Sequence, residues 1–273
     1  MHTCPLDRRQ RREHVLGMSR RKFLSLVTRL VAAESLATPA WAGSPPTPQK
    51  APKIGGICFD LFTLFDPRSV ARAADAIAPG RGLELWNAWK SRHFEYSWLR
   101  AVARRYVDFE VVTEQSLVYA ANELKMSLSP SARQQLVGAY CELEPWPDTR
   151  ANLLAWKQAG LKLAPLSNYS PKMLARLIAR NNLQDVFNVL ISTDAAQTYK
   201  PDARAYALGP ARLGLPREQI AFSAFGGWDA AGAKWFGFPT FWVNRLGVTA
   251  EQLILPDASG ADLTSLASWI AAR

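Results

Sequence analysis

The stretch ICFDLFTLFDPRSV, residues 57–70, places a carboxylate directly after an apolar run. That run predicts a buried strand over residues 54–59, with Asp60 at its end. No glycine separates Asp60 from Thr63, although a tight turn after a strand commonly uses one. Taken alone, an aspartate in this position is more often a turn former than a catalytic group, so its role depends on the rest of the chain.

Beyond residue 147 the chain alternates between apolar runs of strand length and segments with helical spacing. Gly160 marks a helix end, and Ser170 followed by Pro171 marks a helix start. The predicted strands cover residues 54–59, 161–167, 186–192, 220–225 and 239–244, and the predicted helices cover residues 148–160, 170–182, 202–214 and 228–237. Strands that alternate with helices predict an α/β fold with a doubly wound, Rossmann-like parallel sheet.

A purely helical block interrupts this alternation after the first strand. Residues 68–142 have apolar side chains at helical spacing and no strand pattern. The block predicts an inserted α-helical cap subdomain over residues 67–146, and residues 54–66 and 147–273 then form the core. In doubly wound sheets ligands bind at the carboxyl ends of the strands, which is where Asp60 is expected.

The first 42 residues have the features of a twin-arginine export signal. SRRKFL at residues 19–24 matches the signature, and AWA at residues 40–42 is a small-x-small cleavage site. We therefore expect export through the twin-arginine machinery to the periplasm, with a Pro-rich linker over residues 43–53. A basic amphipathic helix is the alternative. We expect no membrane span, because no uncharged apolar run is long enough.

Charge and cysteine content exclude two further classes of site. The formal net charge is +10, but the first 42 residues hold eight basic and three acidic residues, and the other 25 basic and 20 acidic residues are scattered. Nothing in this pattern indicates nucleic-acid binding. Cys4 would leave with the signal, and Cys58 and Cys141 lie in a predicted strand and helix. We expect two buried thiols rather than a disulfide framework or a metal site.

Several motifs in order give the chain a family resemblance. The sequence over about residues 54–250 resembles the haloacid dehalogenase superfamily, specifically the type II (S)-2-haloacid dehalogenases. The matching segments are FDLFTLFD, EYSWLRAVARRYVDF, LKLAPLSNYSP, TYKPDARAY and WDAAGAKWFGFPTFWVNR. The resemblance implies hydrolysis of short 2-haloalkanoic acids to 2-hydroxy acids, without a metal or another cofactor, and a possible homodimer.

The resemblance also assigns catalytic roles to six residues. Asp60 would be the nucleophile that displaces halide and forms an aspartyl ester. Lys200 would offset the negative charge of Asp60 and the substrate, and Asp229 would hold Lys200. Ser167 and Asn168 are expected to bind the substrate carboxylate or orient the nucleophile, with a turn or helix cap as the alternative, and Thr63 is expected to form a hydrogen bond in the first loop.

Six further residues are implied on the substrate and halide side of the site. These are Lys90, Phe62, Phe94, Phe109, Tyr206 and Trp228. Phe62 stands where phosphatases of the superfamily carry a second aspartate beside magnesium, which argues against phosphate ester cleavage. Core packing is the alternative for Tyr206 and for the lone aromatic residues of the cap.

The sequence departs from the family pattern at four places. The first loop lacks the family glycine before Thr63, Tyr169 replaces a glycine, and Lys90 replaces an arginine. Ala224, Phe225 and Gly226 replace Ser-Ser-Asn, so polar groups that serve ester hydrolysis are absent. These departures leave a second hypothesis open: a catalytically degenerate member that binds a small acid or has no enzymatic role.

Overall fold

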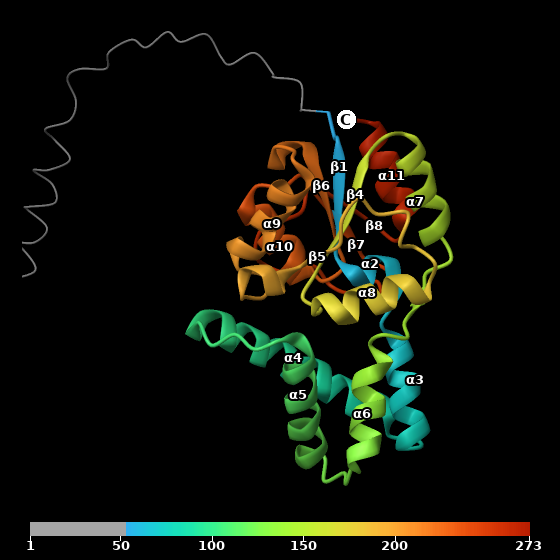
Figure 1. The fold of residues 1–273 in the computed structure, drawn as a ribbon, viewed down its shortest axis with the longest axis vertical. Coiled ribbons are helices and arrows are strands. Elements are labelled where there is room, and N and C mark those ends of the chain that lie inside the picture. Colours follow the sequence, from blue (N-terminus) through green and yellow to red (C-terminus); the bar gives the residue numbers. More distant parts are fainter. Residues whose placement is uncertain (1–52) are drawn as a thin grey trace, which may run out of the picture. The chain divides into compact units, whose positions relative to one another are not determined.

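The computed structural model describes residues 53–273; the expected signal and Cys4 lie outside this range. The predicted fold class is confirmed, because six parallel strands form one sheet in the order β5-β4-β1-β6-β7-β8 (Figure 1). The strands are β1 (Gly56–Phe59), β4 (Lys162–Ser167), β5 (Ile191–Ser192), β6 (Ile220–Ala224), β7 (Thr240–Val243) and β8 (Ala258–Gly260).

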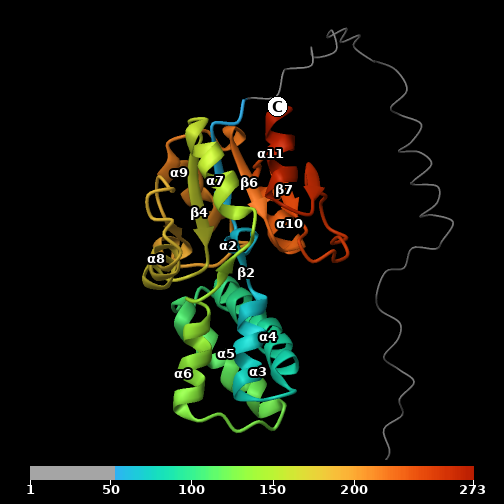
Figure 2. The same ribbon diagram turned by 90° about the vertical axis from the view of Figure 1, so that its right-hand side faces the viewer.

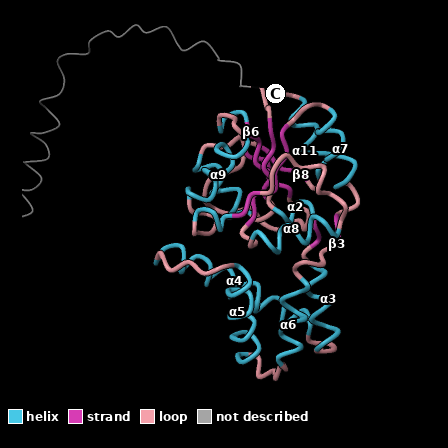
Figure 3. Tube along the Cα trace, viewed as in Figure 1, coloured by secondary structure: helices cyan, strands magenta, loops and turns pink. Residues whose placement is uncertain are grey.

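Helices cover both faces of this sheet. α9 and α10 pack together on one side and α7 and α11 on the other, with the strands between them (Figures 1 and 3). The helical elements of the core are α2 (Leu61–Leu64), α7 (Thr149–Gln158), α8 (Pro171–Arg180), η1 (Thr193–Ala196), α9 (Ala203–Leu213), η2 (Arg217–Gln219), α10 (Gly227–Phe236) and α11 (Leu263–Ala271).

The sequence of β1 explains why the sheet is buried on both faces. Successive side chains of a strand point to opposite faces, so Ile57 and Phe59 enter one apolar cluster and Cys58 enters the other. None of the three is exposed to solvent. Cys58 and Cys141 are both buried and free, as expected, and burial raises the pKa of the Cys58 thiol to about 12.

The helical block forms a cap on a two-stranded connection. β2 (Phe65–Asp66) pairs with β3 (Glu144–Pro145) in antiparallel fashion. The cap helices come between these two strands in the sequence and lie below β2 in Figure 2. They are α3 (Arg68–Ile77), α4 (Gly82–Ala103), α5 (Phe109–Glu123) and α6 (Pro130–Ala139). No helix within residues 53–273 is both long and apolar enough to cross a membrane.

The structure differs from the sequence prediction at one strand and at the C-terminal end. Of the strand predicted over residues 186–192, only Ile191 and Ser192 pair in the sheet. The side chain of Asn188 accepts a hydrogen bond from the backbone N–H of Leu163 at 2.8 Å, in place of a strand partner. β8 and α11 lie beyond the segment that the sequence pattern identified. β8 extends the edge of the sheet past β7.

Helix boundaries follow local chemistry. Ser170 caps α8 by accepting a hydrogen bond from the backbone N–H of Met173, and Pro171 occupies the first turn, as predicted. Gly160, with φ of +80°, follows α7 in the left-handed region that glycine tolerates best.

A close approach between α3 and α4 generates the first prediction. A Cβ at Gly82 would lie 2.2 Å from the backbone nitrogen of Asp75, whereas a Cβ at Gly138 in α6 would meet nothing within 4 Å. We expect Gly82→Ala to destabilise the protein by about 1–3 kcal/mol, because backbone atoms must move. Gly138→Ala should instead stabilise it by about 0.5–1 kcal/mol through helix propensity. Urea denaturation measures both, and an equal effect of the two variants would contradict the packing argument.

Candidate active site

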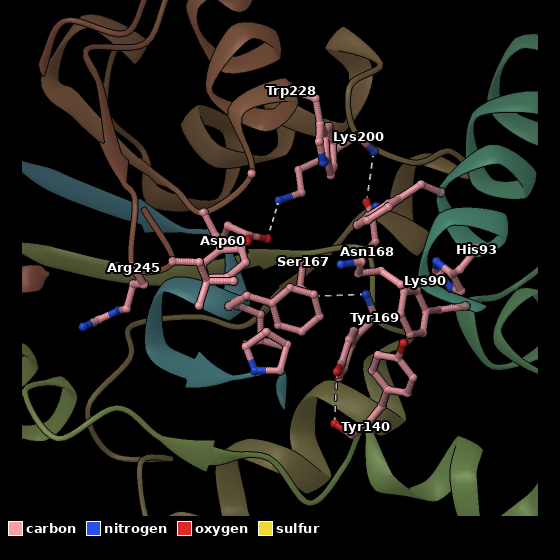
Figure 4. A pocket seen from close by; sticks show the side chains of 18 of the residues that line it. Asp60, Lys90, His93, Tyr140, Ser167, Asn168, Tyr169, Lys200, Trp228 and Arg245 are labelled. Atoms are coloured by element: carbon pink, nitrogen blue, oxygen red, sulfur yellow. Dashed lines mark hydrogen bonds and ion pairs between the residues drawn. The ribbon is translucent and has the colours of Figure 1, made fainter. Parts of the chain in front are cut away.

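A cavity of about 210 Å³ lies between the carboxyl ends of the core strands and the cap (Figure 4). The core contributes polar groups, among them Asp60, Ser167 and Lys200. One face of α4 contributes Trp86, Lys90, His93 and Phe94, whose spacing of three to four residues puts them on the same side of the helix. The walls are therefore mainly aromatic, with the charged groups concentrated at the sheet edge.

Lys200 joins two carboxylates at this edge. Its Nζ lies 2.8 Å from Asp60 Oδ1 and 2.7 Å from Asp229 Oδ2. Both side chains line the cavity, and Asp60, at 15% exposed, is more accessible than Lys200, at 1%. The ammonium also lies 5.4 Å from the ring centroid of Phe222. Two loop residues, Asp60 and Lys200, and Asp229 in the first turn of α10 thus form one ionic cluster.

The charge balance of the cluster is set by burial. Burial lowers the pKa of Lys200, but the two adjacent carboxylates outweigh it, so the net pKa is raised and the ammonium stays charged. Asp229 shares that single cation and is fully buried. Burial, partly offset by Lys200 and augmented by Asp60, raises the pKa of Asp229 to about 6. At neutral pH both Lys200 and Asp229 are therefore ionised.

Tyr206 supports Asp229 from behind the cavity. Its hydroxyl donates to Asp229 Oδ1 at 2.6 Å, and the ring is fully buried among Phe222, Phe236 and Phe238. Tyr206 does not line the cavity. The expected contact between Tyr206 and the substrate is therefore replaced by a contact with Asp229, because the ring packs below the ionic cluster.

Ser167 and Asn168 follow β4 and leave donors free toward the cavity. Ser167 Oγ accepts a hydrogen bond from the backbone N–H of Tyr169 at 3.1 Å. Asn168 Oδ1 accepts from the backbone N–H of Lys200 at 2.9 Å and from Thr193 at 3.3 Å. The oxygens are thus occupied as acceptors, while the Ser167 hydroxyl proton and the Asn168 NH₂ have no protein acceptor within residues 53–273. Two such donors suit an anion.

The loop after Asp60 turns without a left-handed residue. No residue from Asp60 to Asp66 has a positive φ, and the chain enters the one-turn helix α2 directly. The Thr63 hydroxyl donates to the Asp60 carbonyl at 2.7 Å, and its backbone N–H binds the same oxygen at 3.0 Å. A helical turn needs no glycine, which explains its absence. Thr63 is buried and holds the Asp60 backbone without lining the cavity.

The aromatic wall near Asp60 contains the residues that depart from the family pattern. Phe62 lies 5.9 Å from Phe225 and 6.4 Å from Tyr169 between ring centroids, in edge-to-face geometry. Tyr169 donates its hydroxyl to the carbonyl of Tyr140 at 3.0 Å, and its ring lies 4.6 Å from Phe109 in the cap. Tyr169 therefore ties the core to the cap in a way that glycine could not.

Gly226 is a second departure from the family pattern, and the position of the Trp228 side chain explains why a small residue fits there. A Cβ at position 226 would lie 2.7 Å from Trp228 Nε1. The indole thus occupies the space that a side chain at position 226 would need, and it reaches Phe94 of the cap at 5.3 Å between ring centroids. Trp228 and Phe94 both line the cavity, as expected.

Two nitrogen-containing side chains of α4, Lys90 and His93, line the cavity. The ammonium of Lys90 lies 4.5 Å from the ring centroid of Trp86, and burial lowers its pKa. No carboxylate within residues 53–273 pairs with it. His93 contacts Thr113 Oγ1 at 3.1 Å, and burial lowers the pKa of His93 to about 3, so it is neutral. Sequence reasoning missed His93, because a lone histidine on an apolar helix face carries no motif signal.

The sequence and the fold were compared with those of known proteins. A family model for haloacid dehalogenase-like hydrolases matches residues 55–237. The chain belongs to the haloacid dehalogenase-like hydrolases. Within residues 53–273 of this hydrolase no group of three or more His, Cys, Asp or Glu side chains is arranged to hold a metal ion.

Among its relatives, the (S)-2-haloacid dehalogenase of Pseudomonas sp. strain YL is 43% identical over 201 residues, which cover 73% of this chain and 87% of that protein. The fold also matches a solved L-2-haloacid dehalogenase at a TM-score of 0.79 and 37% identity, covering 81% of this chain and all of the other. The L-2-haloacid dehalogenase of Xanthobacter autotrophicus with chloropropionic acid covalently bound matches at a TM-score of 0.75 and 34% identity, covering 80% and 98%.

The buried ionic cluster generates the second prediction. Lys200→Met should leave two facing carboxylates without their cation and destabilise the protein by about 3–5 kcal/mol. Lys234→Met is the matched control, since Lys234 pairs with Asp257 near the surface at 3.0 Å. Its loss should cost below about 1 kcal/mol. Thermal and urea unfolding measure the stability of both variants. Similar decreases in the free energy of unfolding would show that the buried cluster stabilises the fold no more than the surface pair does.

Proposed function

We propose that this hydrolase converts short (S)-2-haloalkanoic acids and water to 2-hydroxy acids and halide, through an ester on Asp60. One observation carries the proposal. Asp60 lines an apolar cavity with one oxygen held by Lys200, and its other oxygen, Oδ2, has no partner within residues 53–273. A carboxylate that is fixed, ionised and only partly hydrated is a competent nucleophile.

In the first step Asp60 Oδ2 attacks C2 of the substrate. A carbon–oxygen bond forms, the carbon–halogen bond breaks on the opposite side, and the configuration at C2 inverts. The substrate carboxylate is held by the free donors of Ser167 and Asn168. Halide then leaves away from Asp60, and the unpaired ammonium of Lys90 offers a point charge for it.

In the second step water attacks the carbonyl carbon of the ester. Lys200, already within 2.8 Å of Asp60 Oδ1, stabilises the negative charge that develops on that oxygen. Cleavage of the ester releases the 2-hydroxy acid and restores the Asp60 carboxylate. Phe62, Phe225 and Trp228 limit the water that reaches the site, which strengthens these electrostatic interactions.

The comparisons support this reaction class. Relatives at 34–43% identity over most of their length are named as haloacid dehalogenases that act on (S)-2-haloacids, and one on haloacetate. The covalent chloropropionic acid in the Xanthobacter autotrophicus structure supports an ester intermediate.

A second candidate is a small-acid-binding protein without turnover. The segment Ala224, Phe225 and Gly226 favours it, because it presents no polar side chain to a hydrolytic water. In that case the first step would stop at a stable ester, or no chemistry would follow binding.

Export through the twin-arginine route to the periplasm belongs to the same proposal. The supporting feature is SRRKFL followed by AWA in the first 42 residues. Mass spectrometry of the exported protein should show a chain that begins near Gly43. Homodimer formation stays a prediction, which sedimentation of the purified protein would test.

The third prediction concerns the nucleophile. Asp60→Asn should reduce halide release from (S)-2-chloropropionate by at least about 1,000-fold, because a neutral amide cannot displace halide at a useful rate. Halide is measured by ion chromatography, with a magnesium-dependent phosphatase assay in parallel.

Asp257→Asn, which alters a surface carboxylate outside the cavity, should retain activity. Peptide mass spectrometry distinguishes the two candidates. Wild type that accumulates an ester on Asp60 without releasing hydroxy acid would favour the binding protein. Dehalogenation that survives Asp60→Asn would exclude Asp60 as nucleophile.

The fourth prediction concerns pH. Asp229 must be ionised to share Lys200 with Asp60, and its pKa is about 6, so kcat/KM should be near its maximum at neutral pH, half of that maximum near pH 6 and lower below it. Tyr206→Phe removes a hydrogen bond that favours the ionised form of Asp229. The acidic limb should therefore move to higher pH in this variant. A limb that stays at the same pH in Tyr206→Phe would show that Asp229 does not cause it.

A further inference from the structure

The loop that carries Asp60 contains a helix too short to be stable by itself. α2 has only four residues, and a single helical turn does not stabilise itself, because its last carbonyl groups have no partners in the helix. The loop also lacks the family glycine. Something outside the loop must therefore hold the turn that sets the direction of the Asp60 side chain.

Three side chains from outside the loop bind its carbonyl groups in succession. Trp146 Nε1 donates to the Phe62 carbonyl at 3.0 Å, and the Thr149 hydroxyl donates to the Leu64 carbonyl at 2.7 Å. Arg245 donates twice to the Thr63 carbonyl between them, from Nη2 at 2.8 Å and from Nε at 3.2 Å.

Arg245 is the charged member of this set and is itself firmly held. Only 6% of its side chain is exposed, and Nη2 forms an ion pair with Asp148 Oδ1 at 2.9 Å. The guanidinium also lies 4.9 Å from the ring centroid of Trp146. Asp148 Oδ2 accepts from the backbone N–H of Leu263, at the start of α11. The guanidinium is therefore held by two segments distant in sequence, one at Thr63 and one at residues 146–148.

The base of Arg245 is also fixed. The residue follows β7. The backbone N–H of the preceding Asn244 donates a hydrogen bond to the Gly260 carbonyl of β8 at 2.8 Å, which fixes the chain at the end of the strand. The side chain lines the cavity on the far side of Asp60 from Asn168 and His93 (Figure 4). Its guanidinium nevertheless directs its hydrogen bonds to the Thr63 carbonyl and its ion pair to Asp148, so its polar contacts are with the loop and its support.

We propose that Arg245 is a positioning residue that sets the aim of the Asp60 nucleophile by clamping the Thr63 carbonyl. This inference rests on the proposed dehalogenation. The contact chain is short: Arg245 holds the Thr63 carbonyl, and Thr63 holds the Asp60 carbonyl through its hydroxyl and its N–H. In-line displacement is sensitive to the angle of attack, so a small rotation of the loop lowers the rate without abolishing substrate binding.

Arg245→Met and Arg245→Lys test the proposal. Methionine removes all donors, and kcat for halide release should fall about 10- to 100-fold. The inhibition constant of the 2-hydroxy acid product should stay within about twofold, because Ser167 and Asn168 are untouched. Lysine keeps the charge but offers one point donor for two acceptors, so it should restore only part of kcat.

Arg176→Met is the matched control, because Arg176 pairs with Glu142 at the surface and lies outside the cavity. It should leave kcat and the inhibition constant unchanged. The positioning role is overturned if Arg245→Met alters kcat less than about threefold, or if the inhibition constant rises as much as kcat falls.

A second measurement does not depend on turnover. Native-state hydrogen exchange of peptides over residues 60–66 should be at least about 10-fold faster in Arg245→Met than in wild type, while peptides over β4 keep their protection. Equal exchange in both proteins would overturn the clamp. Wild type that releases no halide, yet shows this difference on substitution, would overturn the proposed function and leave the clamp supported.

Discussion

The sharing of one buried ammonium between two carboxylates is the interaction on which the site depends. Lys200 contacts Asp60 at 2.8 Å and Asp229 at 2.7 Å. Burial raises the pKa of Asp229, the nearby Lys200 ammonium offsets part of this rise, and the adjacent Asp60 adds to it. Asp60 is the member of the cluster that is partly exposed to the cavity, whereas Asp229 is fully buried and accepts a hydrogen bond from Tyr206.

The departures from the family pattern become coherent when the contacts are considered together. The missing glycine is compatible with a helical turn that other segments bind through its carbonyl groups. Tyr169 adds a hydrogen bond to the Tyr140 carbonyl and an aromatic contact with Phe109, so it joins the core to the cap. Gly226 leaves room for the Trp228 indole. Tyr169 and Phe225 thus add aromatic side chains to the cavity wall beside Phe62 and Trp228.

The same changes focus the functional question on the second chemical step. Displacement of halide needs a fixed carboxylate, an apolar pocket and a few anion donors, and all of these are present around Asp60. Hydrolysis of an ester also needs an oriented water. The segment Ala224, Phe225 and Gly226 offers no side-chain donor or acceptor for one, so Lys200 and backbone groups carry that step in the proposed reaction.

The sequence by itself determined the fold class, the alternation of strands and helices, and the identity of the charged residues at the strand ends. These follow from local periodicity and from motifs that occupy a few consecutive residues. Ser167, Asn168, Lys200 and Asp229 could therefore be named before their positions in space were known.

Only the tertiary structure decided how these groups meet. It placed Tyr206 behind Asp229 instead of beside the substrate, and it let Asn188 replace part of a predicted strand by a side-chain hydrogen bond. It also brought His93 and Arg245 to the site. His93 lies outside the matching segments and Arg245 ends one of them, but the role of each depends on partners such as Thr113, Thr63 and Asp148 that are distant along the chain. Contacts of that kind arise from the packing of the whole fold, and local periodicity contains no information about them.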